Sequence, residues 1–151
     1  MVILDFGSVW NGYTGDFARM TIVGEPSSTQ QALYRAAYDA LTAPIEAIRA
    51  GVLCSEVDLI GREVIAGAGF AAYAQPWVIG HQLGFGLHGK PVLGPGVDVP
   101  LHAGMAVNIE PSLYTYDDVS IGGVELEDTI LVTETGSRRL SDFPYESRLL
   151  A

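Results

Sequence analysis

Six ionisable residues stand in apolar or glycine-rich stretches of the sequence and could do chemistry together. They are Asp5, Asp16, His81, His88, Glu110 and Glu127. Acids inside apolar strands are costly unless something positive lies between them. That positive group could be a lysine, a shared proton or a metal ion. Lys90 is the only lysine in the chain, and a shared proton cannot balance four carboxylates, so divalent cations fit the whole set best.

The donor types narrow the kind of metal. Four carboxylates with one or two histidines and no cysteine form a hard, oxygen-rich set. Such a set suits Mn²⁺, Mg²⁺, Fe²⁺, Co²⁺ or Zn²⁺ in a hydrolytic site better than a thiolate-rich structural zinc site. Because a carboxylate can bridge, four acids can serve two ions, which lie about 3.5–4 Å apart in sites that clamp a water and a substrate oxygen.

These residues and their order resemble the pita-bread metallopeptidases, a family that includes methionine aminopeptidases, Xaa-Pro aminopeptidases and prolidases. The family pattern is two Asp residues, a Gly-His-x-x-Gly segment, an Ile-Glu-Pro segment and a final Glu before Asp-Thr or His-Thr. Here it reads as Asp5 and Asp16, eleven apart, then residues 80–84, 109–111 and 127–129. His88, seven residues after His81, matches the family's second active-site histidine. The resemblance extends from Asp5 to about Leu140.

The resemblance implies a role for each of these residues. Asp5 and Asp16 would chelate and bridge two divalent ions, with Glu127 as the second bridge. His81 and Glu110 would complete the second ion, and Glu110 would handle the proton of the attacking water. His88 would hydrogen-bond the scissile carbonyl or the developing oxyanion. The metal ligands are thus Asp5, Asp16, His81, Glu110 and Glu127, and the catalytic residues are His81, His88 and Glu110.

The function implied is a dinuclear-metal hydrolase of the Xaa-Pro aminopeptidase or dipeptidase type, in which a metal-bound hydroxide attacks a peptide carbonyl. Manganese is the expected metal, with cobalt, zinc or iron as alternatives, and the substrate is a peptide or a small amide. Arg19, in Asp16-Phe-Ala-Arg19, matches a frequent family arginine and is expected to pair with a site carboxylate and orient it.

The sequence departs from the family pattern in three places. Relatives that cleave before proline usually carry Arg two residues before the final Glu, where this chain has Glu125, and Gly89-Lys90 follows His88. The family's first half normally precedes the first Asp, so we expect residues 1–151 to be one partial catalytic domain that lacks most of the N-terminal half. Two alternatives stay open: a small non-peptide C–N substrate, as in creatinase or ectoine hydrolase, and a truncated binding module without catalysis.

Local signals predict the strands that carry these residues. Residues 2–6 and 16–23 read as paired strands around the turn pair Asn11-Gly12, since both turn residues tolerate positive φ. Residues 105–111, 112–116 and 124–133 read as further strands, and the Gly/Pro-rich segment 75–91, with His81, reads as a loop.

Two helices are expected between these groups of strands. A helix over residues 31–50 is capped by Ser27 or Ser28, is kinked or broken near Pro44 and ends at Gly51. A second helix opens at Ser55 with Asp58 as its capping-box partner. The order of a hairpin, two helices and antiparallel strands is an α+β pattern, in agreement with a pita-bread fold.

Composition bounds the remaining choices. The formal net charge of −10 argues against nucleic acid or an anionic membrane surface as a partner. Cys54 is the only cysteine, so no internal disulfide can form, and a reducing, cytoplasmic location is expected. No apolar run approaches the length of a membrane span. Exposed sheet edges in a partial domain need cover, which makes a homodimer possible.

Overall fold

The computed structural model describes all residues 1–151, and it begins with a long hairpin. Strands β1 (Val2–Trp10) and β2 (Tyr13–Thr21) pair antiparallel, from Val2 opposite Thr21 to Trp10 opposite Tyr13. Asn11 and Gly12 form the turn with φ of 50° and 87°. The predicted Asn-Gly hairpin is therefore confirmed, with β1 reaching four residues further than expected.

The main sheet has five strands in the order β4-β3-β5-β8-β9, and every neighbouring pair is antiparallel. Its strands are β3 (Gly80–Leu83), β4 (Gly89–Leu93), β5 (Ala106–Ile109), β8 (Asp128–Val132) and β9 (Ser137–Arg139). A separate two-stranded ribbon joins β6 (Ser112–Tyr114) to β7 (Gly123–Glu125).

Two strand predictions were wrong in detail. The segment 124–133 is two strands, because the chain changes partner at residues 126–127 and passes from β6 to β5. The segment 75–91 is not all loop, since β3 and the start of β4 lie within it. His81 therefore sits on a strand between two paired neighbours, which is a more rigid position than the predicted loop.

Helix α1 (Ser28–Ala47) begins as predicted, since Ser27 and Gln30 form a reciprocal capping box. The helix runs through Pro44 for three residues and ends at Ala47, not at Gly51 as predicted. Ile48 closes its last turn by donating to the carbonyl oxygen of Pro44.

Helix α2 (Cys54–Gly67) begins one residue before the predicted Ser55. Glu56, and not Asp58, accepts from the backbone N–H of Leu53 at the helix start. Asp58 is instead buried and accepts from Arg62 Nε at 2.6 Å, an i, i+4 pair. The remaining helical segments are short: η1 (Ala71–Tyr73) and α3 (Ser147–Leu150).

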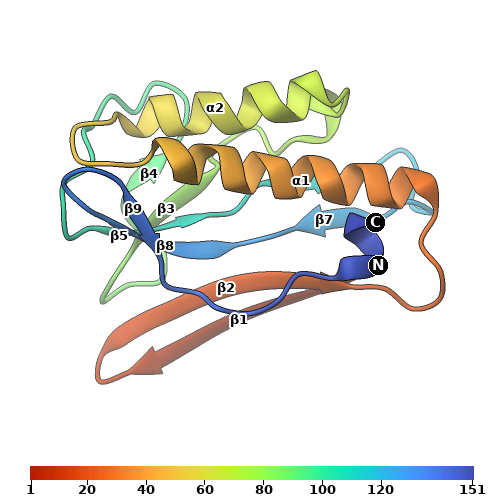
Figure 1. The fold of residues 1–151 in the computed structure, drawn as a ribbon, viewed down its shortest axis with the longest axis horizontal. Helices are drawn as coiled ribbons and strands as arrows, with labels where there is room; N and C mark the ends of the chain where they lie inside the picture. The colour runs from red at the N-terminus through yellow and green to blue at the C-terminus, as the bar shows by residue number, and fades with distance from the viewer.

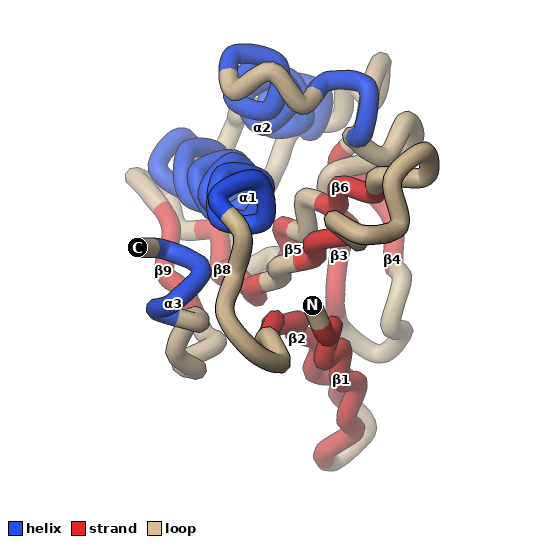
Figure 2. Tube along the Cα trace, turned by 90° about the vertical axis from the view of Figure 1, so that its right-hand side faces the viewer, coloured by secondary structure: helices blue, strands red, loops and turns tan.

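The two long helices lie on one face of the main sheet, and the hairpin lies toward the opposite face (Figure 1). Figure 2 shows the same layers from the side, with α1 and α2 together and β1–β2 at the far end. Leu33 and Leu41 of α1 pack with Val107, Ile109 and Ile130 of the sheet in one buried core. This α+β architecture agrees with the predicted fold class and leaves the sheet face opposite the helices available for a site. None of the helices combines the length and apolarity that crossing a bilayer requires.

Candidate metal centre

The hairpin register sets the two aspartates on one face. Asp5 pairs with Ala18, and Gly7 pairs with Asp16. Directly paired residues point to the same side, and residues two apart on a strand share a face, so Asp5 and Asp16 point the same way as diagonal neighbours. Asp16 is buried and Asp5 is exposed. Together with Glu127 they offer carboxylate oxygens that all lie within 4.8 Å of one another.

His81 lies close to Asp16 and Glu127 and also to a further acid, Glu110. Its Nε2 is 3.5 Å from Glu110 Oε1, 3.7 Å from Glu127 Oε1 and 4.0 Å from Asp16 Oδ2. His81, Glu110 and Glu127 form another set of ligand atoms within 4.8 Å of one another. Glu127 thus belongs to both groups, as a bridging ligand must.

The fit of a cation to this site rests on one buried atom. His81 is 2% exposed, and its Nε2 has no hydrogen-bond partner. Its Nδ1 lies 3.2 Å from the carbonyl oxygen of Gln82, and a proton donated there leaves the Nε2 lone pair facing the carboxylates. A lone pair among carboxylate oxygens is repulsive unless a positive group lies between them. The residues present therefore fit a divalent cation.

The crowding of acids shows in their pKa values. Burial, followed by the charges of Glu127 and Asp5, raises the pKa of Asp16 to about 6. Burial and the charge of Glu127 raise the pKa of Glu110 to about 7. Burial alone would lower the pKa of His81, but its contact with Glu127 and the charge of Glu110 outweigh burial and raise it. Without a cation, Asp16 and Glu110 therefore bind protons at a higher pH than ordinary carboxyl groups do.

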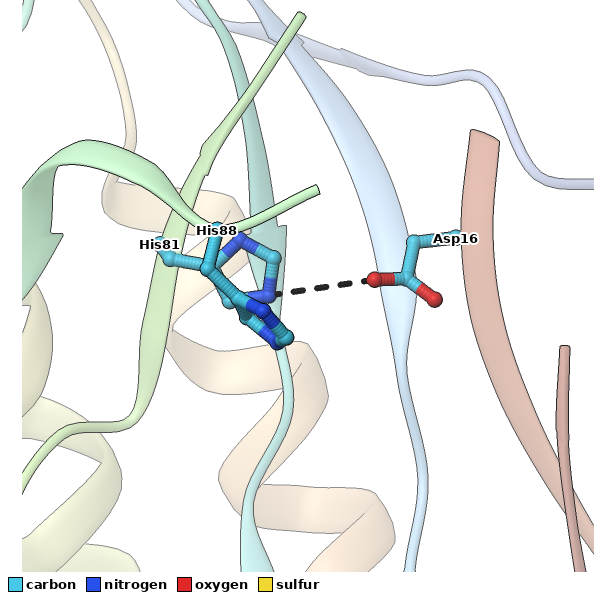
Figure 3. Close-up of side chains that lie close together, drawn as sticks. All are labelled: Asp16, His81 and His88. Carbon is cyan, nitrogen blue, oxygen red and sulfur yellow. Dashed lines mark ion pairs between the residues drawn. The ribbon is translucent and has the colours of Figure 1, made fainter. Parts of the chain in front are cut away.

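His88 comes close to the centre from the loop that precedes β4. Its side chain is exposed, and its ring centroid lies 4.5 Å from that of His81 with the planes at 62°. Asp16, His81 and His88 form a third set of ligand atoms within 4.8 Å of one another. Figure 3 shows the two rings side by side, with Asp16 facing them from β2. The structure therefore brings together all six residues singled out in the sequence.

Two polar residues that support the site were not predicted. Asn108 is fully buried on β5, and its Nδ2 donates to Glu127 Oε1 at 2.7 Å. Thr129 Oγ1 donates to the carbonyl oxygen of Asp16 at 2.9 Å. The available signal for Asn108 is its place two residues before Glu110 in an apolar strand, where an amide needs a partner.

Arg19 does not pair with any of the predicted ligands, which corrects the sequence-based expectation. Its Nη2 is 2.6 Å from Oδ1 of the fully buried Asp128, the neighbour of Glu127. Its Nη1 donates to the backbone carbonyl oxygen of Glu127 at 2.7 Å. Arg19 thus holds the backbone of a candidate ligand while its charge pairs with Asp128, the next residue in the sequence.

A wide cleft adjoins the candidate centre on one side. It has a volume of about 810 Å³ and lies between the hairpin turn and the ends of β3 and β5. Half of its 16 lining residues are hydrophobic, including Tyr13, Phe17, Leu83 and Phe85. Asp16 is the only one of the six predicted residues that lines it. The cleft therefore lies beside the group of His81, Glu110 and Glu127, and it meets the centre at Asp16.

Comparison with known proteins places this geometry in a family. The sequence profile of metallopeptidase family M24 matches residues 1–134. The Xaa-Pro dipeptidase of Pyrococcus furiosus is 34% identical over 141 residues, which cover 93% of this chain and 39% of that protein. Dipeptidase PepE of Mycobacterium ulcerans superposes with a TM-score of 0.89 at 35% identity over 95% of this chain and 38% of that one.

More distant structures share the fold. X-Pro aminopeptidase from Thermotoga maritima has a TM-score of 0.89 at 25% identity and covers 95% of this chain and 39% of that one. Methionine aminopeptidase from Rickettsia prowazekii, at 23% identity, has a TM-score of 0.80. The chain spans about two fifths of the length of the dipeptidases that it matches. With a family match over most of its residues and this shared architecture, the chain belongs to metallopeptidase family M24 and has part of its pita-bread fold.

Proposed function

We propose that this chain carries a dinuclear metal site for hydrolysis of a peptide bond, of the Xaa-Pro dipeptidase or aminopeptidase type. Asp5, Asp16 and Glu127 would hold one divalent ion, and His81, Glu110 and Glu127 the other. The observation that carries the proposal is the partnerless Nε2 of buried His81 among three carboxylates. Manganese is the proposed metal, with cobalt, zinc and iron as alternatives, because the donors are carboxylates and imidazole.

Two residues would act on the substrate. When bound, the ions would lower the pKa of a water and polarise the substrate carbonyl. Glu110 would take the proton from the attacking water and pass it to the leaving amine, since its carboxylate is half-buried beside His81. His88 would donate a hydrogen bond to the oxygen of the carbonyl, from an exposed loop that a substrate can reach. Asp16, His81 and Glu127 would hold their positions, because all three are buried.

The proposed substrate is based on the names of relatives that are 34–35% identical to this chain. Three of them bear the names Xaa-Pro dipeptidase or dipeptidase. We therefore propose a short peptide with a free amino terminus as the substrate. A small non-peptide amide is a second candidate, because Glu125 puts a carboxylate on β7 close to the centre, where it repels the carboxylate of a dipeptide.

Metal binding is the first test, because it does not depend on turnover. Titration with Mn²⁺ at about pH 7.5 should load two ions per chain. A stoichiometry of about one would overturn the dinuclear site, and a value below about one would overturn the metal site itself. Glu110→Gln should weaken binding and reduce any hydrolysis of Xaa-Pro dipeptides at least about 100-fold. Glu134→Gln removes an equal charge from an exposed turn and serves as the matched control. Wild-type activity in Glu110→Gln would show that the assigned proton transfer is wrong.

A further inference from the structure

Glu125 lies on β7, two residues before the candidate ligand Glu127, and belongs to none of the three ligand groups. Its neighbours Val124 and Leu126 are fully buried in the core. Since successive strand residues point to opposite faces, the side chain of Glu125 points away from that core. Glu125 pairs with Ser112 of β6, two residues after Glu110, and lies two residues before Glu127. Glu125 thus has one candidate ligand, Glu127, close to it along the chain and another, Glu110, close to it on the neighbouring segment.

The carboxylate of Glu125 is held in place, but its charge is not neutralised. Its Oε2 accepts from the hydroxyl of Tyr114 and lies 3.4 Å from Ser112 Oγ. Both partners are uncharged, and no ion pair in the chain involves Glu125. Two hydroxyl contacts fix the orientation of a carboxylate without cancelling its field.

The field of Glu125 reaches the metal centre. Through its pairing with Ser112 it lies next to Glu110, and along the chain it lies two residues from Glu127, so its unneutralised charge acts on both candidate ligands. Loading two divalent ions would set four positive charges against the five carboxylates of Asp5, Asp16, Glu110, Glu125 and Glu127. The loaded site would therefore keep one negative charge, and Glu125 is the carboxylate that carries it, because the other four would face the ions.

We infer that Glu125 is a specificity-determining residue, which makes this site prefer ligands with an ammonium or guanidinium group over ligands with a carboxylate. A cationic group placed beside Glu125 gains an ion pair in a half-buried setting. A carboxylate placed there meets an unpaired like charge, which disfavours binding. This inference rests on the proposed function, because it supposes that the ligand occupies the metal centre.

Two ligands of similar size test the inference by binding alone. L-leucinamide carries an ammonium and no carboxylate, and N-acetyl-L-leucine carries a carboxylate and no ammonium. Their dissociation constants are measured by calorimetry on the Mn²⁺-loaded chain and on the variants Glu125→Gln, Glu125→Asp and Glu134→Gln. The ratio of the two constants within each variant removes any effect of the substitution that the two ligands share.

Glu125→Gln should shift this ratio about fivefold toward the carboxylate ligand, which corresponds to about 1 kcal/mol. The introduced amide oxygen can still accept from Tyr114, so the strand contact is retained. Glu125→Asp should keep the wild-type preference, and Glu134→Gln should leave the ratio unchanged because Glu134 lies in an exposed turn after β8.

The outcomes separate this inference from the proposed function. If Mn²⁺ fails to bind the wild-type chain, the proposed function is overturned and this inference is overturned with it. If Mn²⁺ binds Glu125→Gln as tightly as wild type but the ratio of constants stays within twofold, the role of Glu125 alone is overturned. An equal shift in Glu134→Gln would also overturn it, because it would show a general effect of net charge.

Discussion

Replacing Arg19 by methionine should destabilise the chain and weaken metal binding at a residue that touches no ligand side chain. Arg19 is 3% exposed and forms an ion pair with Asp128. It also donates to the backbone carbonyl oxygens of Ala18, Glu127 and Phe143 at 2.7–2.9 Å. Its guanidinium carbon lies 4.3 Å from the ring centroid of Tyr145. Methionine keeps much of the side-chain volume and removes every one of these polar contacts.

The structure sets the size of the effect. Removing one partner of a buried ion pair typically costs about 3–5 kcal/mol. Asp128 keeps a second cation, since Arg139 Nε lies 3.2 Å from its Oδ2, and it keeps the hydroxyls of Ser141 and Tyr145. We therefore expect the lower end of the range, about 3 kcal/mol in the free energy of unfolding. The freed Glu127 backbone should lower Mn²⁺ affinity about tenfold, as loss of outer contacts to metal ligands does.

Urea unfolding followed by circular dichroism measures the first effect, and calorimetric Mn²⁺ titration measures the second. Arg49→Met is the matched control, because Arg49 is exposed and makes one contact, to the carbonyl oxygen of Ala47 at 3.2 Å. The control should change the free energy of unfolding by less than about 0.5 kcal/mol. If Arg19→Met changed stability and Mn²⁺ affinity no more than the control does, the reasoning about this network would be refuted.

Three further predictions follow from the site and the core. Asn108→Ala removes the buried donor to Glu127 and should weaken Mn²⁺ binding about tenfold in the same titration, and an unchanged affinity would contradict its supporting role. The metal-free chain should melt at a lower temperature as pH rises from about 4 to 7, because the pKa values of Asp16 and Glu110 are raised in the folded state to about 6 and about 7. The stabilisation from their bound protons is complete below their unfolded pKa values and is lost as pH passes the folded ones. A melting temperature that stays constant or rises from about pH 4 to about pH 7 would contradict this prediction. Cys54 is fully buried, and burial raises the pKa of its thiol, so it should react with a thiol reagent only after urea is added; rapid labelling of the native chain would contradict this.

Local sequence signals predicted the parts of the fold that local chemistry determines. The Asn11-Gly12 turn and the Ser27–Gln30 capping box depend on residues within a few positions of each other, and both formed as expected. The six candidate site residues were also identified from the sequence, because burying several acids in apolar strands is costly unless a positive charge balances them. Their convergence in space agrees with the expected site, while metal binding by these residues stays a prediction.

The errors fall where distant parts of the chain decide the structure. The glycines around His81 predict a loop, yet Gly80 is required by sheet packing. A Cβ at Gly80 would lie 2.0 Å from the carbonyl oxygen of Asn108, so only glycine allows β3 to approach β5 this closely. The partner of Arg19 is 109 residues away in sequence, and nothing local indicates that contact. Sequence patterns therefore identified the site residues better than the contacts that hold them.

The hairpin turn affects the candidate metal centre because it sets the register of β1 against β2. Asp5 lies on β1, whose only paired neighbour is β2, so the position of its carboxylate depends on the register of that one pair. A slip of one residue would turn Asp5 to the opposite face and remove it from Asp16 and Glu127. A two-residue turn with positive φ at both positions fixes the register of a hairpin. Asn11 and Gly12 therefore act on the candidate site by setting which face of β1 carries its acid.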